Sequence, residues 1–118
     1  MMRKTLLAMV LGLFLVNFAN AEEKILWQQI GMGSKTTEML FLPDKDLILA
    51  VVYRDPSRLK IEWVLEDGKT WTLLLERKGP LMVKGPVKAV RGTGSFRVTA
   101  RDRRKWHIAV IEVREKRR

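Results

Sequence analysis

From residue 22 onward, hydrophobic positions recur in short runs that alternate with polar residues, and no helical period is sustained. Gly, Pro and Asp interrupt the runs about every ten residues, a spacing typical of all-β domains. The expected strands cover 25–30, 35–42, 47–53, 59–65, 69–76, 81–90, 95–101 and 106–113. So many short strands need two packed sheets or a closed barrel to bury their apolar faces. We predict a small antiparallel β-sandwich of about seven or eight strands, with a small closed barrel of the OB type as the alternative.

One predicted hairpin can be aligned residue by residue, because its two strands each alternate large apolar and polar side chains. A two-residue turn at 67–68 would place Trp63 opposite Thr72 and mix the two faces. A three-residue turn at 66–68, with its glycine in the left-handed conformation, places Trp63 opposite Trp71 and keeps the large side chains together. The second arrangement is our prediction, and it makes both tryptophans core residues.

The first 21 residues have a different pattern. A cationic start with Arg3 and Lys4 precedes an apolar stretch at 6–18, which ends at Ala19-Asn20-Ala21. This is the order of a secretory signal peptide. The stretch has 13 residues, whereas a helix that crosses a bilayer needs about 20. We therefore predict cleavage after Ala21, a periplasmic or secreted product, and no transmembrane anchor after cleavage.

The rest of the chain is predicted to be one domain. Residues 22–113 are expected to form the sandwich, and 114–118 a basic C-terminal tail. The sequence contains no cysteine. Disulfides, thiolate metal sites, thiol redox chemistry and a lipid anchor on cysteine are therefore excluded, and the fold must be stabilised by packing.

Charge is distributed unevenly along this domain. Residues 22–76 contain 7 Lys and Arg against 10 Asp and Glu, whereas residues 77–118 contain 14 against 3. Concentrated like charge attracts anionic partners. The same charge can also serve solubility alone, and the sequence leaves both interpretations open.

The basic residues of the second half form two clusters, at 101–105 and 114–118. If the strands at 95–101 and 106–113 form a hairpin, the clusters lie at its opposite ends; the register of that hairpin stays open because its turn contains no glycine. Arginine favours bidentate contact with phosphate or carboxylate. The candidate contacts to a polyanion are Arg101, Arg103, Arg104, Lys105, Arg114, Lys116, Arg117 and Arg118.

No catalytic or metal-binding motif is complete. The segment Gly31–Thr36 lacks the spacing of a phosphate-binding loop, so we interpret it as a structural turn. A triad of Ser95, Asp102 and His107, the single histidine, lacks a nucleophile-elbow sequence around the serine. The close acidic pairs lie in predicted turns. We predict that the protein is not an enzyme and uses no metal or cofactor.

Two strand motifs resemble a known class of domain. The segment Gly92-x-Gly94-x-Phe96-x-Val98 precedes Trp106-x-Ile108-x-Val110. This order resembles small exported prokaryotic β-sandwich domains of unassigned function, in which a Gly-x-Gly-x-aromatic strand is followed by a Trp-x-aliphatic-x-aliphatic strand. The resemblance implies fold and export, and it implies no ligand and no functional residue.

The leading hypothesis from the sequence is an exported, non-catalytic binding or structural module of the cell envelope. One alternative is a cationic binder of envelope polyanions such as lipopolysaccharide, anionic lipid or acidic polysaccharide; nucleic acid is not an expected partner. A second alternative is a proteinaceous inhibitor of an envelope hydrolase, for which Gly79–Gly85 would be the inserting loop. The partner, which could also be another envelope protein, and the oligomeric state stay open.

Overall fold

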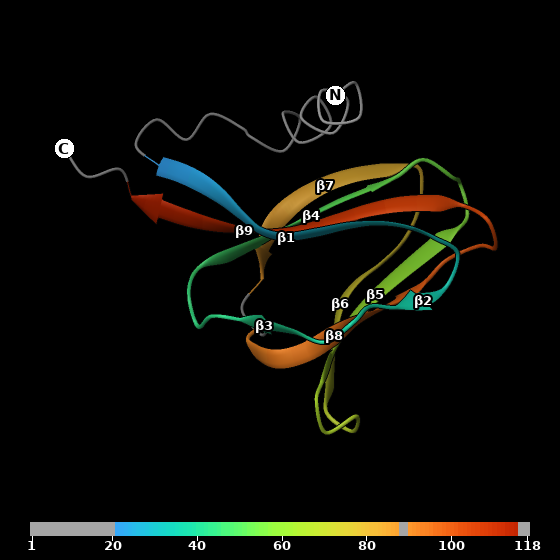
Figure 1. The fold of residues 1–118 in the computed structure, drawn as a ribbon. Helices are drawn as coiled ribbons and strands as arrows, with labels where there is room; N and C mark the ends of the chain where they lie inside the picture. The colour runs from blue at the N-terminus through green and yellow to red at the C-terminus, as the bar shows by residue number, and fades with distance from the viewer. Residues whose placement is uncertain (1–20, 88–89, 116–118) are drawn as a thin grey trace, which may run out of the picture.

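The computed structural model describes residues 21–87 and 90–115, which form nine β-strands and no helix (Figure 1). These residues accordingly contain no helix long and apolar enough to cross a bilayer. The strands are β1 (Ala21–Met32), β2 (Lys35–Thr36), β3 (Leu40–Leu42), β4 (Leu47–Tyr53), β5 (Arg58–Leu65), β6 (Trp71–Lys78), β7 (Leu81–Val87), β8 (Gly92–Thr99) and β9 (Lys105–Glu115).

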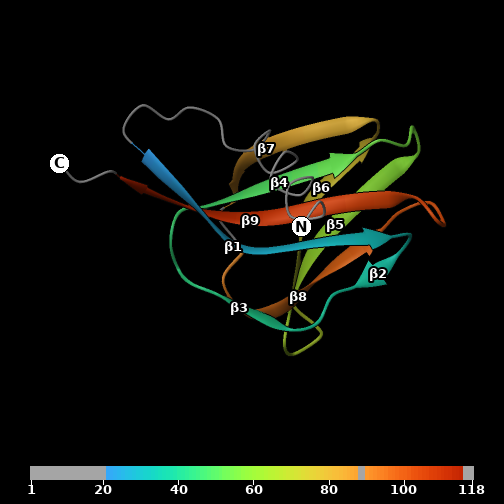
Figure 2. The same cartoon turned by 45° about the horizontal axis from the view of Figure 1, so that its top comes forward.

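The strands form two antiparallel sheets that pack face to face (Figures 1 and 2). The four-stranded sheet has the order β1-β9-β4-β7, and the five-stranded sheet has the order β2-β8-β5-β6, with β3 also paired to β8. Among the described residues, no strand pair joins one sheet to the other. The predicted β-sandwich is therefore confirmed, and the closed barrel is not the observed arrangement.

The core lies between the sheets and consists of every second side chain of the long strands. Tyr53, Trp63, Phe96 and Trp106 are its largest fully buried members. Trp27 stacks on Phe96 with 5.0 Å between ring centroids, and Phe96 lies 4.9 Å from Trp63. Aromatic packing of this density can stabilise a small domain that has no disulfide.

The strand predicted at 35–42 is divided into β2 and β3. Between them, the Thr37 N–H donates to the Phe96 carbonyl at 2.9 Å, and the Phe96 N–H donates to the Thr37 hydroxyl at 2.9 Å. A side-chain oxygen thus takes the place of a backbone carbonyl in the ladder. The periodic sequence pattern does not show such a substitution, because it reports only which face a residue occupies.

The predicted register of the β5–β6 hairpin is wrong. Trp63 lies opposite Thr72 and Trp71 lies opposite Val64, with a register shift between Ile61 and Glu62. The turn is longer than predicted, since the Leu65 N–H donates to the Thr70 carbonyl across four intervening residues. Trp71 therefore faces outward and is 53% exposed, whereas Trp63 is 1% exposed.

The reason for this register lies in β6 itself. Three leucines in succession, 73–75, give the strand apolar side chains on both faces. An irregularity can then change which residues face the core without exposing a whole apolar face.

The connection between β8 and β9 also differs from the predicted hairpin. The two strands belong to different sheets, so the chain crosses from one layer of the sandwich to the other at 100–104. Phe96 and Val98 consequently enter the core from one side, and Trp106 and Ile108 enter it from the other. Both strands bury their apolar residues in one core by facing each other rather than by pairing.

Two strands end at positions that differ from the predicted boundaries. β9 continues through Glu115, so Arg114 and Glu115 of the predicted tail belong to a strand. β7 ends at Val87. Residues 1–20 of the predicted signal peptide, residues 88–89 and the basic residues Lys116, Arg117 and Arg118 lie outside the described part of the chain.

Candidate functional site

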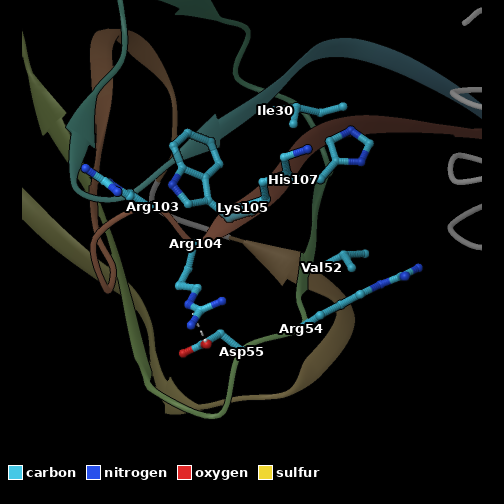
Figure 3. A pocket seen from close by; sticks show the side chains of 9 residues that line it. Ile30, Val52, Arg54, Asp55, Arg103, Arg104, Lys105 and His107 are labelled. Atoms are coloured by element: carbon cyan, nitrogen blue, oxygen red, sulfur yellow. Dashed lines mark ion pairs between the residues drawn. The ribbon is translucent and has the colours of Figure 1, made fainter.

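A hollow of about 510 Å³ lies on the four-stranded sheet, beside the connection between β8 and β9 (Figure 3). Its lining combines cationic side chains, one carboxylate and an apolar floor. The lining residues are Arg54, Arg103, Arg104 and Lys105, then Asp55, then Ile30, Val52, Trp106 and His107. They come from β1, β4, β9 and the chain that adjoins β4 and β9.

Trp106 borders the hollow at the start of β9, and its ring points into the core beneath it. Its indole N–H donates to the Gly33 carbonyl at 2.8 Å, and its side chain is 1% exposed. A Cβ at Gly31 would lie 2.3 Å from the nearest atom of the Trp106 ring, so only glycine fits there. The glycines of the segment Gly31–Thr36 thus seat an indole, in agreement with the predicted structural role of that segment.

His107 lies next to Ile30 and Val52 on the outward side of the sheet (Figure 3). Its Nε2 lies 3.1 Å from the side-chain oxygen of Gln28. Burial lowers the pKa of His107 below its ordinary value of 6.5, because a charged imidazolium loses solvation in this position. The ring is therefore neutral at neutral pH and adds to the apolar floor.

The turn at 101–104 positions the cations. The Arg104 N–H donates to the Arg101 carbonyl at 3.2 Å, and Arg103 has a φ of 62°. This left-handed conformation is one that glycine adopts readily and arginine rarely. The Gly33 N–H donates to the Arg104 carbonyl at 3.0 Å. The turn is therefore tied to the end of β1, and its shape does not depend on its own sequence alone.

Asp55 neutralises one of these cations. Its carboxylate accepts hydrogen bonds from the Ser57 hydroxyl and from the Ser57 N–H, the latter at 2.9 Å, and lies 3.1 Å from Arg104 Nε (Figure 3). The hydrogen bonds from Ser57, and then the charges of Arg104 and Arg101, hold the pKa of Asp55 below its ordinary value. Asp55 is thus ionised at neutral pH, and its negative charge compensates the positive charge of Arg104.

Three cations around the hollow have no such partner. Arg54, Arg103 and Lys105 are exposed, and none of them makes an ion pair with an acidic residue of the described chain. Four cationic side chains thus surround one carboxylate. Uncompensated like charges that border a concave apolar surface raise the local positive potential and attract anions.

The second basic cluster has a different environment. Arg114 Nε lies 3.0 Å from the Glu112 carboxylate, and Lys45 Nζ lies 3.2 Å from the same group. Hydrogen bonds from Arg114 and Lys45 lower the pKa of Glu112, despite its burial. Arg114 is therefore compensated, and it lies near the opposite end of β9 from Lys105, about 30 Å along the strand.

The structure thus brings together three of the eight candidate residues, Arg103, Arg104 and Lys105, with Arg101 in the same turn. It adds Arg54, which the sequence analysis missed. Arg54 directly follows the buried strand β4. Only the sheet order, in which β4 lies beside β9, shows that Arg54 adjoins Lys105.

The structure does not bring together the candidate triad of Ser95, Asp102 and His107. Ser95 is on β8 and His107 on β9, in different sheets, so the two side chains lie on separate layers of the sandwich. Within the described ranges, no group of three or more His, Asp or Glu side chains could hold a metal ion.

Comparison with known proteins adds support for the fold. No protein-family model matches the chain, and no curated protein matches it. The crystal structure of SPBc2 prophage-derived protein YomS is similar, with a TM-score of 0.53 and 12% sequence identity over 84% of this chain and 99% of that chain. At this identity the likeness concerns the fold alone. The resemblance to exported β-sandwich domains stays a prediction.

Proposed function

We propose that the protein is an exported, non-catalytic module of the cell envelope, and that it binds an anionic partner at the hollow beside the β8–β9 connection. The observation that carries the proposal is the convergence of Arg54, Arg103 and Lys105 on one hollow without an acidic partner in the described chain. The predicted signal peptide at 1–21 supports the envelope location.

The chemistry of the lining suits phosphate or carboxylate groups. Arginine presents its donors in a planar fork that matches both anions, and lysine adds a mobile point charge. The ion pair with Asp55 fixes Arg104 in place, while the other cations stay available. Since the turn is tied to Gly33, its backbone gains little order when a ligand binds.

The hydrolase-inhibitor alternative loses its candidate loop. Residues 81–87 form β7, which pairs with β4 along its whole length from Leu81 opposite Tyr53 to Val87 opposite Leu47. Most of the candidate segment is therefore an edge strand rather than a free loop.

Heparin chromatography tests the proposed function. Arg54→Gln, Arg103→Gln and Lys105→Gln, combined in one variant, should lower the slope of log retention against log salt by about 2–3. The matched control is Lys69→Gln, Arg77→Gln and Lys78→Gln, which removes the same charge from the exposed turn and end of β6 and should change the slope by less than about 1. Equal losses in both variants, or no salt-sensitive retention of the wild type, would contradict the proposal.

Export is tested independently of binding. Protein recovered from the envelope fraction should have Glu22 as its N-terminal residue, as read by N-terminal sequencing. An intact Met1 in that fraction would contradict cleavage.

A further inference from the structure

An apolar row runs across the four-stranded sheet beside the hollow. Ile30 lies opposite His107, His107 opposite Val52, and Val52 opposite Met82, so these four side chains share one row on the outward face. Adjacent strands are about 4.8 Å apart, which makes the row about 14 Å wide. Met32 lies opposite Lys105 in the neighbouring outward row.

Three apolar side chains of these two rows are open to solvent. Ile30 is 53% exposed, Met32 56% and Met82 57%. Isolated exposed apolar residues are common, whereas several on one face beside uncompensated cations form a surface with two chemistries. We call this surface the basic–apolar face; it consists of Ile30, Met32 and Met82 with Arg54, Arg103 and Lys105.

We propose that the basic–apolar face docks on an anionic lipid bilayer. The cations contact headgroup phosphates, and Ile30, Met32 and Met82 enter the boundary between headgroups and acyl chains. This inference rests on the proposed function and names its ligand class. Peripheral proteins bind membranes through the same combination of basic charge and a modest apolar insertion, and each basic residue near an anionic surface contributes measurably.

The type of apolar side chain favours a bilayer over an acidic polysaccharide. Sugar rings pack their C–H faces against the flat apolar surface of aromatic side chains, whereas the exposed apolar members of this face are aliphatic or thioether groups. The exposed aromatic residues Phe41 and Trp71 belong to strands of the other sheet. Methionine is flexible and adapts to irregular apolar partners, as acyl chains are.

Vesicle co-sedimentation separates the charged part of the face from the apolar part. Binding is measured with vesicles of phosphatidylglycerol in phosphatidylcholine, and with vesicles of phosphatidylcholine alone. Each preparation is also passed over heparin, and soluble glycerol phosphate is added as a competitor. All proteins are prepared as they are recovered from cells and share one N-terminus, so any contribution of residues 6–18 is common to all of them.

The apolar variant combines Ile30→Ser, Met32→Ser and Met82→Ser. It should bind phosphatidylglycerol vesicles at least about tenfold more weakly than wild type, because each exposed side chain loses its apolar burial in the bilayer. Its heparin elution should be unchanged. Phe41→Ser with Trp71→Ser is the matched control on the other sheet, and it should bind vesicles like wild type.

The cationic variant, Arg54→Gln, Arg103→Gln and Lys105→Gln combined, should lose about 100-fold in vesicle binding, which corresponds to about 1 kcal/mol for each residue. It should also elute earlier from heparin. Wild type should bind phosphatidylcholine alone much more weakly than the mixed vesicles, and glycerol phosphate should displace it only in part. Circular dichroism and melting curves check that every variant is folded.

Several results would overturn the bilayer proposal while the proposed function stands. One is an apolar variant that binds vesicles as tightly as wild type. Another is complete displacement by glycerol phosphate, which would make the hollow a site for a free anionic headgroup. A third is heparin retention without vesicle binding, which would indicate an acidic polysaccharide. Absence of both heparin and vesicle binding would overturn the proposed function as well.

Discussion

The turn between β5 and β6 and the turn between β8 and β9 meet the same backbone requirement in different ways. In the first, Gly68 has a φ of 70°. There the Asp67 carboxylate accepts hydrogen bonds from the Lys69 N–H at 2.7 Å and the Thr70 N–H at 2.8 Å. In the second, the left-handed position is occupied by Arg103, with a φ of 62°.

The residue in the left-handed position therefore differs: glycine in the β5–β6 turn, which adopts it without cost, and arginine in the β8–β9 turn, which carries a charge. Glycine adopts the left-handed region without steric cost, whereas another residue loses about 1–2 kcal/mol there. Strain of this kind tends to be found at functional sites. At Arg103, this conformation places the guanidinium beside the hollow for which anion binding is proposed.

The largest expected contrast concerns the tryptophans of the two regions. Trp63→Ala in β5 and Trp106→Ala beneath the hollow should each lower the free energy of unfolding by about 3–5 kcal/mol, because each ring is buried in the core. Trp71→Ala should cost less than about 1 kcal/mol, since its ring is half exposed. Urea denaturation measures all three. A loss of several kcal/mol in the free energy of unfolding of Trp71→Ala would instead support the register in which both Trp63 and Trp71 face the core.

The next contrast concerns the seat of Trp106. Gly31→Ala should destabilise the protein by about 1–3 kcal/mol, because the new methyl group would overlap the indole ring. Gly85→Ala in β7 is the matched control, since a Cβ there meets nothing within 4 Å, and it should be neutral or slightly stabilising. Melting curves of the two variants provide the measurement. Equal melting temperatures would show that the packing around Trp106 is looser than the structure indicates.

The two left-handed residues should respond to exchange with opposite signs. Gly68→Ala should cost about 1–2 kcal/mol, because the backbone must keep a positive φ. Arg103→Gly should raise the free energy of unfolding by up to about 1 kcal/mol while it weakens heparin retention. Denaturation and chromatography on the same samples check both effects. A loss of stability in Arg103→Gly would mean that the side chain, and not function, accounts for the conformation.

The smallest expected effect is the pH dependence that His107 adds to the stability of the protein. The folded-state pKa of His107 is below 6.5, so the unfolded chain takes up the proton first as the pH falls. Stability is therefore complete above about 6.5 and declines as the pH falls through 6.5 toward the lower folded value. The carboxylates Asp55 and Asp67 have lowered pKa values, so their contribution is lost only in stronger acid.

His107→Gln is the variant that isolates this effect, because the chain contains no other histidine. Denaturation at pH values on either side of 6.5 should show a decline in wild type and none in the variant. The same decline in both proteins would assign it to groups other than His107.

The alternation of apolar and polar residues was sufficient to predict most strands and the two packed layers. Trp63, Phe96 and Trp106 lie in the core as the pattern indicates. The segment Gly31–Thr36 has a structural role as predicted, but only residues 33–34 form the turn, because Gly31 belongs to β1 and Thr36 to β2. The pattern failed for Trp71. Alternation fixes faces only within an unbroken strand, and three consecutive leucines allow β6 to change register without loss of burial.

The candidate site was predictable only in part. The sequence determined that basic residues concentrate after residue 77 and that Arg101, Arg103, Arg104 and Lys105 share a turn. Whether each charge has an acidic partner depends on side-chain contacts that exist only in the folded chain. Asp55 compensates Arg104 across 49 positions, and Glu112 compensates Arg114 within one strand.

The sequence by itself therefore determined the strand content, the layered fold and the sign of the charge, because these follow from local periodicity and composition. The tertiary structure alone decided that β8 and β9 lie in different sheets and that β4 lies beside β9. That order places Arg54 and the apolar row of Ile30 and Val52 next to the cationic turn. Sheet order is set by the joint burial of all strands in one core, and no single segment of the chain contains that information.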